Sequence, residues 1–295
     1  MQWRGRKYAQ CMLAVFAWIL HCEAAAAAAS ATYALYAYSF GNFRNETRGQ
    51  MFEATMQTLG EMQGIDCYFY TDRLPPRQQR AMLNSWTTVV RAQATATDTA
   101  AAASAGIATT RVRAKRLKWD PPPELHRYSY LVHVDCSCHS LQTAVTLLQN
   151  NALKDMVHAN PHVALFIRKN GIRTTMQQEV RAVMQSPKLN PSGSLQTWHA
   201  FLKAADLYGD INAVPLPHTN FFVRNMADNA IIRAGKTLLD VELAQGLWRD
   251  QTVYGYIFAS SAFRNASVMY LDAQWGGYKS HYEACKKQQR QRTAV

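Results

Sequence analysis

The sequence predicts an α/β fold with a central mixed sheet flanked by helices, and three features favour it. A strand-like apolar run, a segment of helical spacing and a second strand-like run follow one another near the start. The strand-like runs at 66–71 and 130–135 each lead to an aspartate, Asp72 and Asp135. A basic run at 111–118 precedes the second. An acid at the carboxyl end of a strand is typical of open α/β sheets, which bind ligands at that edge.

The individual elements follow from local patterns along the chain. Strands are expected where aromatic and branched apolar residues predominate, at 32–38, 66–71, 130–135, 163–167 and 221–224. Helices are expected where apolar residues recur at helical spacing, at 50–62, 109–118, 140–150, 174–185, 194–207, 235–247 and 250–259. The prolines at 121–123 end the helix at 109–118 because proline cannot continue a helix.

Length and composition predict a single domain over residues 30–285. The chain has 295 residues, of which 48% are hydrophobic, enough for one large core or two small ones. Residues 92–108 are rich in alanine and threonine and have no large apolar anchor, so we expect an exposed, mobile insertion loop. Residues 286–295 are expected to form a frayed basic tail.

Residues 1–29 are typical of a targeting segment. Arg4, Arg6 and Lys7 precede an apolar run from Cys11 to Leu20, and six alanines follow at 24–29. The apolar run is shorter than the roughly 20 residues of a membrane span. We therefore predict a signal peptide, with a signal anchor on the lumenal side of the Golgi or ER as the close alternative and a buried N-terminal helix as the third.

Other features agree with the secretory pathway. Asn45-Glu-Thr47 and Asn265-Ala-Ser267 are acceptor triplets for N-glycosylation, which predicts a glycoprotein. After the targeting segment four cysteines remain, and an oxidising lumen would allow some of them to pair: Cys67, Cys136, Cys138 and Cys285. Four cysteines allow three pairings, and the sequence leaves all three open.

The charge of the chain favours anionic partners. The net charge is +12, which suits nucleotide phosphates, membrane surfaces or acidic glycans. The sequence contains no RNA-recognition or zinc-finger pattern, so we expect no nucleic-acid partner.

Several short pieces together indicate a family. In chain order they are Asp66-Cys-Tyr-Phe-Tyr-Thr-Asp72, Lys118-Trp-Asp-Pro121, Tyr130 to Asp135, Val163-Ala-Leu-Phe166, Arg173 with Glu179, Phe222-Val-Arg224, and Trp248-Arg-Asp-Gln251. With these pieces, residues 32–262 resemble the glycosyltransferase-like domain of plant mucilage-related proteins, a plant turgor-regulation protein and many bacterial proteins. The resemblance implies a GT-A-like, nucleotide-diphospho-sugar transferase fold with an acidic strand end at the diphosphate site.

The resemblance also implies roles for individual residues. Asp135 would bind Mn²⁺ or Mg²⁺, which neutralises the leaving diphosphate, although Ser137 stands where the second acid of an Asp-x-Asp pair is expected. Asp72 would accept hydrogen bonds from the base or ribose of the nucleotide-sugar donor. The diphosphate would be clamped by three cations, Arg113, Lys115 and Lys118. As structural alternatives, the acids would cap a helix or a turn, and the cations would form the solvated face of a helix.

For catalysis, Asp250 is the first candidate. A transferase that inverts the sugar carbon needs a base for the acceptor hydroxyl, and Asp250 would supply it while Gln251 hydrogen-bonds the sugar. Glu179 is the rival base, although a lone glutamate on a helix usually faces solvent. Alternatively, Asp250 caps the helix that follows it.

A metal cluster of another kind is the competing interpretation around Asp135. Residues 133–139 include types that zinc prefers, and His133 would point to the same side of its strand as Asp135. The sequence has no second cluster of this kind and no Cys-x-x-Cys, so we rank a zinc site low. A nucleophilic Cys–His pair ranks lower still.

The sequence therefore predicts a lumenal glycosyltransferase that moves a sugar from a nucleotide-sugar donor to a glycan or glycoconjugate acceptor. The family pattern has histidines where this chain has Pro122 and Asn170-Gly171. Those differences favour, as the alternative, a catalytically inactive relative that binds glycans or a partner. A third hypothesis is a hydrolase of ceramide-type lipid amides, because one plant relative is linked to ceramide cleavage.

Overall fold

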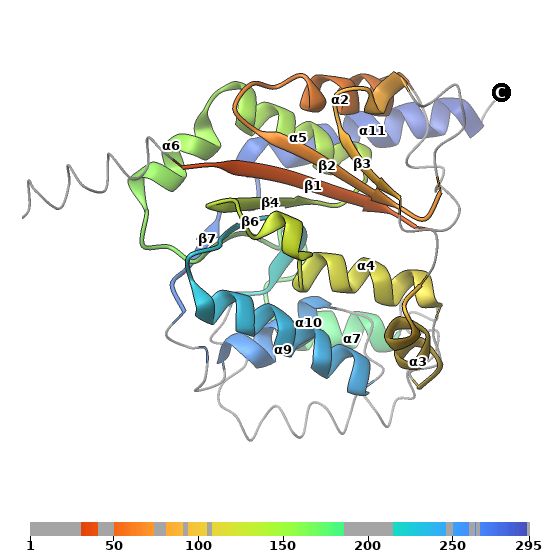
Figure 1. Cartoon of the computed structure of the whole chain (residues 1–295), viewed down its shortest axis with the longest axis vertical. Coiled ribbons are helices and arrows are strands. Elements are labelled where there is room, and N and C mark those ends of the chain that lie inside the picture. The colour runs from red at the N-terminus through yellow and green to blue at the C-terminus, as the bar shows by residue number, and fades with distance from the viewer. Residues whose placement is uncertain are drawn as a thin grey trace, which may run out of the picture.

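The computed structural model describes residues 31–40, 50–73, 81–90, 94–104, 108–185, 215–245, 250–259, 263 and 266–293. These residues form a seven-stranded mixed sheet between two layers of helices (Figure 1). The predicted α/β class, a central mixed sheet flanked by helices, is confirmed.

The sheet reverses its strand order at one place. Across the sheet the strands are β3 (Thr87–Val90), β2 (Asp66–Thr71), β1 (Tyr33–Ser39), β4 (Tyr130–Val134), β6 (Pro217–Asn225), β5 (Leu165–Lys169) and β7 (Val268–Leu271). β6 runs antiparallel to both of its neighbours, and the other described pairs are parallel. The chain leaves β1 for β2 and β3 on one side and returns to β4 on the other. In open α/β sheets the carboxyl ends of two such strands flank a crevice that binds ligands.

Each face of the sheet carries its own helical layer (Figure 1). One layer comprises α2 (Gln50–Gly60), α5 (Cys138–Gln149), α6 (Ala152–Ala159) and α11 (Tyr278–Thr293). The other comprises α4 (Thr109–Trp119), α7 (Met176–Met184), α9 (Asn229–Gln245) and α10 (Asp250–Ala259). Side chains alternate along the strands, so Phe166 packs in the first layer and Ile167 in the second.

The expected loop at 92–108 is wrong in its central part, because α3 (Ala96–Ser104) lies there and packs against α4. The segment Thr95-Ala-Thr-Asp98 is a capping box: the Asp98 amide donates to Thr95 Oγ1 at 3.0 Å. Alanine, the strongest helix former, continues the helix. Arg116 Nε of α4 donates to the buried Asp98 Oδ1 at 2.8 Å, which fixes α3 in place.

The expected basic tail at 286–295 is helical to Thr293, because α11 continues that far. A disulfide joins Cys138, at the start of α5, to Cys285 in α11. Of the pairings that the sequence left open, the structure contains this one, and Cys67 and Cys136 are free thiols. The disulfide holds α11 against the segment that follows Asp135.

Several predicted features lie outside the described residues. They are the targeting segment at 1–29, the glycosylation sites Asn45 and Asn265, the helix expected at 194–207, and Trp248 with Arg249. Among the helices that the structure does describe, none combines the length and the apolar character that a membrane span requires.

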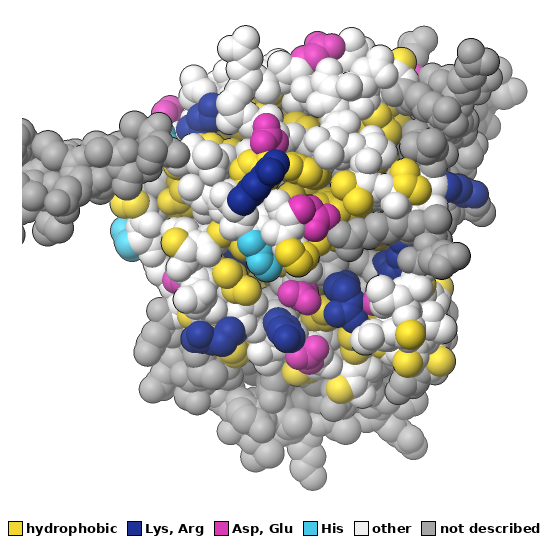
Figure 2. Space-filling model, in the orientation of Figure 1, with side chains coloured by type: hydrophobic (Ala, Val, Ile, Leu, Met, Phe, Trp, Pro, Cys, Tyr) yellow, Lys and Arg dark blue, Asp and Glu magenta, His cyan; other side chains and the backbone are white. Residues whose placement is uncertain are grey.

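The positive charge of the chain is dispersed on the face shown in Figure 2. Lys and Arg side chains lie there singly, beside Asp and Glu side chains, rather than in one continuous basic patch. The net charge of +12 therefore does not mark a binding surface on the described part of this face.

Gly235 of α9 allows a close contact with the end of α4, and this gives a test of the fold. A Cβ at position 235 would lie 2.4 Å from the Trp119 carbonyl oxygen. Alanine gains about 1 kcal/mol of helix propensity over glycine, whereas overpacking costs about 1–3 kcal/mol. Because backbone cannot move aside as a side chain can, we expect Gly235→Ala to lower the free energy of unfolding by about 1–2 kcal/mol in urea denaturation.

Lys236→Ala, at an exposed position of the same helix, is the matched control and should change the free energy by less than about 0.5 kcal/mol. A Gly235→Ala protein as stable as wild type would contradict the close approach of α9 to α4.

Candidate functional site

Asp135 lies at the edge of the sheet where the strand order reverses. It directly follows β4, and the neighbouring strand β1 leads to Phe40 at the same edge. The side chain of Asp135 is 36% exposed, so a ligand can reach it from solvent. Its backbone amide donates to the Asn220 carbonyl oxygen of β6 at 2.8 Å, which fixes its position.

His133 supports Asp135 from the same side of β4, as the alternation of side chains predicted. His133 Nε2 lies 3.2 Å from Asp135 Oδ1. A carboxylate only accepts hydrogen bonds, so the imidazole donates from Nε2. Burial lowers the pKa of His133 to about 4 against the opposing effect of Asp135, so the ring is neutral at pH 7.

Lys118, near the end of α4, links two carboxylates. Its Nζ lies 2.8 Å from Asp250 Oδ2 and 3.6 Å from Asp135 Oδ1. It also donates to Thr219 Oγ1 at 3.2 Å. The residue is only 5% exposed, and burial lowers its pKa, but the two carboxylates outweigh burial and raise it above the ordinary value. Lys118 is therefore a buried ammonium ion.

The same ammonium ion keeps Asp135 ionised. Burial raises the pKa of the Asp135 carboxyl, but attraction to Lys118 and the hydrogen bond from His133 outweigh it and hold the pKa well below its ordinary value. Both partners contact Oδ1, and among the described residues no hydrogen bond or ion pair reaches Oδ2. Asp135 thus presents one charged oxygen atom to a ligand.

A second lysine extends the charged group. Lys115 precedes Lys118 by three residues, which puts both on one side of α4. Its Nζ lies 2.8 Å from Glu242 Oε1 and 3.3 Å from Asp250 Oδ1. Burial raises the pKa of Glu242 to about 7, although Lys115 opposes this. We call Lys115, Lys118, Asp135, Glu242 and Asp250 the lysine–carboxylate network.

Backbone contacts hold the end of α4, and with it the network. The buried Arg224 of β6 donates from Nη2 to the Lys118 carbonyl oxygen at 3.0 Å. The Tyr36 hydroxyl of β1 donates to the same oxygen at 3.2 Å. The Trp119 ring stacks on Phe222 with their centroids 5.2 Å apart. Helix carbonyls that would otherwise lack partners are thereby satisfied, and Lys118 is fixed relative to β1 and β6.

The structure brings together four of the eight residues that the sequence singled out, namely Lys115, Lys118, Asp135 and Asp250. The other four lie around them or apart. Arg113 stacks on Phe40 with Cζ 4.3 Å from the ring centroid, and Asp72 follows β2 at the same sheet edge. Gln251 donates from Nε2 to the Pro217 carbonyl oxygen at 3.1 Å.

Glu179 is buried on α7 rather than facing solvent as expected. Its Oε2 accepts from Arg173 Nη1 at 2.7 Å, an ion pair that spans the turn between β5 and α7. A buried, paired glutamate of this kind has a structural role in joining the two elements.

Three members of the site were not predicted from the sequence, namely Thr219, Glu242 and His133 in its role as a donor to Asp135. Glu242 carried a usable signal: it lies four residues after Leu238, within the apolar face of a helix. An acid in that position requires a buried cation as its partner. The sequence around Thr219 gives no indication of its role, because that role depends on β6 running antiparallel beside β4.

The described residues of the site provide few ligands for a metal ion. Among the described residues, no group of three His, Cys, Asp or Glu side chains is placed to hold a metal ion. In the network, Asp135 offers a charged oxygen, Oδ2, on a partly exposed side chain, and Mg²⁺ often binds through one or two carboxylates plus substrate phosphates. A divalent cation fits here only together with a diphosphate. Cys138, one of the residues considered for a zinc site, is in the disulfide and is therefore not a thiolate ligand.

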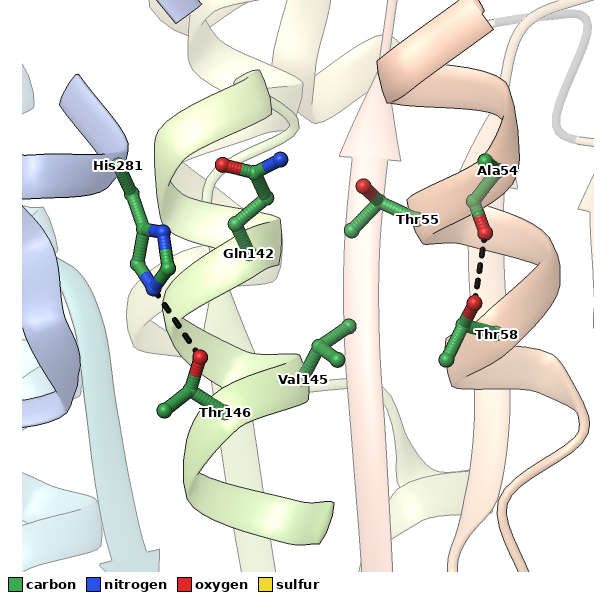
Figure 3. Close-up of a pocket in the computed structure, with 7 residues that line it drawn as sticks. All are labelled: Ala54, Thr55, Thr58, Gln142, Val145, Thr146 and His281. Carbon is green, nitrogen blue, oxygen red and sulfur yellow. Dashed lines mark hydrogen bonds between the residues drawn. The ribbon is translucent and has the colours of Figure 1, made fainter. Parts of the chain in front are cut away.

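A separate cavity of about 300 Å³ lies between α2, α5 and α11 (Figure 3). Its lining is mostly threonine, alanine, valine and glutamine side chains, and His281 Nε2 lies 3.0 Å from Thr146 Oγ1. Because the described residues of the lining include no lysine, arginine or carboxylate, the cavity is a poorer candidate for a nucleotide diphosphate than the edge at Asp135.

Comparison with known proteins adds no assignment. No protein-family model matches the chain. No curated protein matches it at a significant level either.

The depressed pKa of Asp135 predicts how stability depends on pH. A carboxyl whose pKa is lower in the folded state stabilises the fold above its unfolded pKa, near 3.9, and loses that contribution as pH falls. The difference in free energy of unfolding between wild type and Asp135→Asn should therefore be largest above about pH 4 and shrink toward pH 2. Urea denaturation across this range measures it.

Ser137→Ala, two residues away and uncharged, is the control and should follow the wild-type dependence. If the difference between wild type and Asp135→Asn stayed constant from pH 6 to pH 2, Lys118 would not be holding the carboxyl in its ionised form.

Proposed function

We propose that this chain is a lumenal glycosyltransferase that moves a sugar from a nucleotide-sugar donor to a glycan or glycoconjugate acceptor. The placement of Asp135 carries the proposal: it is ionised and partly exposed, and it lies where the strand order of the sheet reverses. That edge is the general ligand site of open α/β sheets.

The finer fold assignment, a GT-A-like domain, is part of the same proposal. It is supported by a mixed sheet with helices on both faces and by an acid at the carboxyl end of β4. These features agree with the sequence pieces that resemble the glycosyltransferase-like domain.

The donor would occupy the crevice between β1 and β4. The aromatic ring of Phe40, with Arg113 stacked on it, borders the β1 side and suits a nucleobase. The diphosphate would lie at Asp135, and two anionic groups need a cation between them. When bound, Mn²⁺ or Mg²⁺ held by Asp135 Oδ2 would supply charge neutralisation of the leaving diphosphate. Lys118 would hold Asp135 ionised and in place.

Asp250 fits a positioning role better than the role of base that the sequence suggested. Its two oxygen atoms already contact Lys115 and Lys118, and its side chain is almost fully buried, so an acceptor hydroxyl has little access to it. In this proposal Asp250 keeps Lys118 against Asp135. Gln251, next along α10, anchors the start of β6.

The secretory location is proposed on independent grounds. The disulfide between Cys138 and Cys285 suits an oxidising compartment. We expect the chain, produced in a eukaryotic secretory cell, to carry N-glycans at Asn45 or Asn265 and to lose mass on treatment with an N-glycosidase. An unmodified chain with residues 1–29 intact and no disulfide would argue against this location.

Donor binding is the first test of the function. A nucleoside diphosphate with Mn²⁺, at about 100 times its dissociation constant, adds roughly 2.7 kcal/mol of stability, which raises the melting temperature by roughly 5 °C or more. We expect this rise for wild type in thermal-shift assays with UDP, GDP or CDP, and its loss in Asp135→Asn. Asp155→Asn, exposed on α6, should behave as wild type.

Turnover separates the enzyme from the inactive relative. That second candidate is favoured by one observation, that Lys115 and Lys118 are already paired with carboxylates. Release or transfer of a labelled sugar from the donor by wild type, lost in Asp135→Asn, supports the transferase. Binding of a nucleotide without turnover, or no response to any nucleotide, would contradict the transferase and favour the inactive relative that binds glycans or a partner.

A further inference from the structure

Arg168, near the end of β5, is a buried cation with no acidic partner among the described residues. It is 1% exposed, and its Nη2 donates to Asn220 Oδ1 at 2.8 Å. Its Nε and Nη1 atoms are buried and have no hydrogen-bond partner in the described part of the chain. Burial lowers the pKa of its guanidinium to about 10, which leaves it charged at pH 7. A buried charge with unused donors is costly, so the site is incomplete without an anion.

Aromatic and neutral polar side chains surround this guanidinium. The Tyr278 ring covers it with the ring centroid 3.5 Å from Cζ, and the Tyr278 hydroxyl lies 3.1 Å from His218 Nε2. His139 packs against the same ring at 5.1 Å. Burial lowers the pKa values of His218 and His139 to about 4, so both rings are neutral at pH 7. These neighbours are neutral, so they do not balance the single positive charge of Arg168.

The position of this group relative to Asp135 is informative. Arg168 lies on β5, which is separated from β4 by β6 alone. Neighbouring strands are about 4.8 Å apart, so Arg168 is roughly 10 Å from the β4 end, on the side away from β1. A donor whose base lies between β1 and β4 and whose diphosphate lies at Asp135 would direct its sugar, or the acceptor, toward Arg168.

Hydrogen bonds connect the two places. Asn220, the partner of Arg168, donates from Nδ2 to Ser140 Oγ at 2.7 Å, and Ser137 Oγ donates to Ser140 Oγ at 2.8 Å. Ser137 lies two residues after Asp135, in the turn that begins α5. These hydrogen bonds fix the position of Arg168 relative to the turn that follows Asp135.

We propose that Arg168 binds the carboxylate of a uronic-acid-type sugar, belonging either to the donor or to the acceptor. This deepens the proposed function and rests on it for the assignment to a transferase. The planar guanidinium binds a carboxylate through charge-assisted hydrogen bonds, and the N–H groups of Nε and Nη1, on different sides of the group, remain to donate them. One positive charge balances a monoanionic carboxylate, whereas a terminal phosphate carries closer to two negative charges.

The aromatic residues fit the same ligand. Tyr278 and Tyr282 stack with their centroids 6.4 Å apart, and Tyr282 is 40% exposed. Together they offer flat apolar faces beside a charged group, which suits a sugar ring with one acidic substituent. A neutral sugar would contact the two tyrosine rings but would give Arg168 no anionic partner.

Tyr278 must move for a ligand to reach Arg168, and two glycines precede it in the chain. Gly276 and Gly277 both have φ of 71°, in the left-handed region that favours glycine. They connect Tyr278 to the segment after β7, and in this proposal the Tyr278 side chain turns away from the guanidinium when the ligand binds. Tyr278 acts as a cover that the ligand displaces.

The experiment compares acidic and neutral sugars that are otherwise alike. Binding of UDP-glucuronate and UDP-glucose, and of glucuronate and glucose oligosaccharides, is measured by calorimetry on the full folded chain. We expect at least a tenfold preference for the acidic member of one pair. A preference within the UDP-sugar pair assigns the carboxylate to the donor, and a preference within the oligosaccharide pair assigns it to the acceptor.

Arg168→Met tests the residue itself. It should abolish the preference, while Lys169→Met, which removes a neighbouring exposed charge from the same strand, should retain it. Because Arg168 has no acidic partner, Arg168→Met should melt within a few degrees of wild type. If that variant fails to fold, Arg168→Lys keeps the charge but not the planar guanidinium with its several donors, and it should reduce the preference at least threefold.

Equal binding of acidic and neutral members in both pairs would overturn the inference, as would inorganic phosphate competing as well as glucuronate. The inference and the proposed function fail separately. UDP binding without acidic preference leaves the transferase and removes the carboxylate site. Binding of acidic oligosaccharides without any response to UDP keeps the carboxylate site and removes the transferase.

Discussion

The buried ammonium of Lys118 is the contact on which the rest of the site depends. It lies between Asp135 and Asp250, and Lys115 extends the same group to Glu242. Charges removed from water are tolerated only when each has a partner, and removing one partner of a buried pair costs about 3–5 kcal/mol. The network therefore fixes α4, α9, α10 and the end of β4 relative to one another, and it keeps one carboxylate ionised where solvent reaches it.

The carboxyl edge of the sheet is divided between the two helical layers. The lysine–carboxylate network lies under the layer of α4, α9 and α10, whereas Arg168 and Tyr278 lie under that of α5 and α11. Asp135, at the end of β4, is the member of the network that solvent reaches at this edge. A substrate made of an anionic diphosphate and a second, bulkier part would span both groups, which gives this edge a natural division into two subsites.

The sequence predicted the parts of the site that local patterns determine. Asp72 and Asp135 follow from strands that end on acids, and the three-residue spacing of Lys115 and Lys118 follows from helical periodicity. It could not predict that Glu242 and Asp250 come from separate helices to these lysines, since that depends on packing across the sheet. The helix at 96–104 has a signal in the sequence, the capping box at Thr95–Asp98, but the low complexity of the surrounding alanine-rich segment favoured a loop.

The most direct test of the central claim is a crystal structure of the protein soaked with a nucleoside diphosphate and Mn²⁺. We predict density for the nucleotide between the ends of β1 and β4, with its diphosphate within metal-bridging reach of Asp135 Oδ2. Density only in the cavity between α2, α5 and α11, or a diphosphate bound away from Asp135, would contradict it.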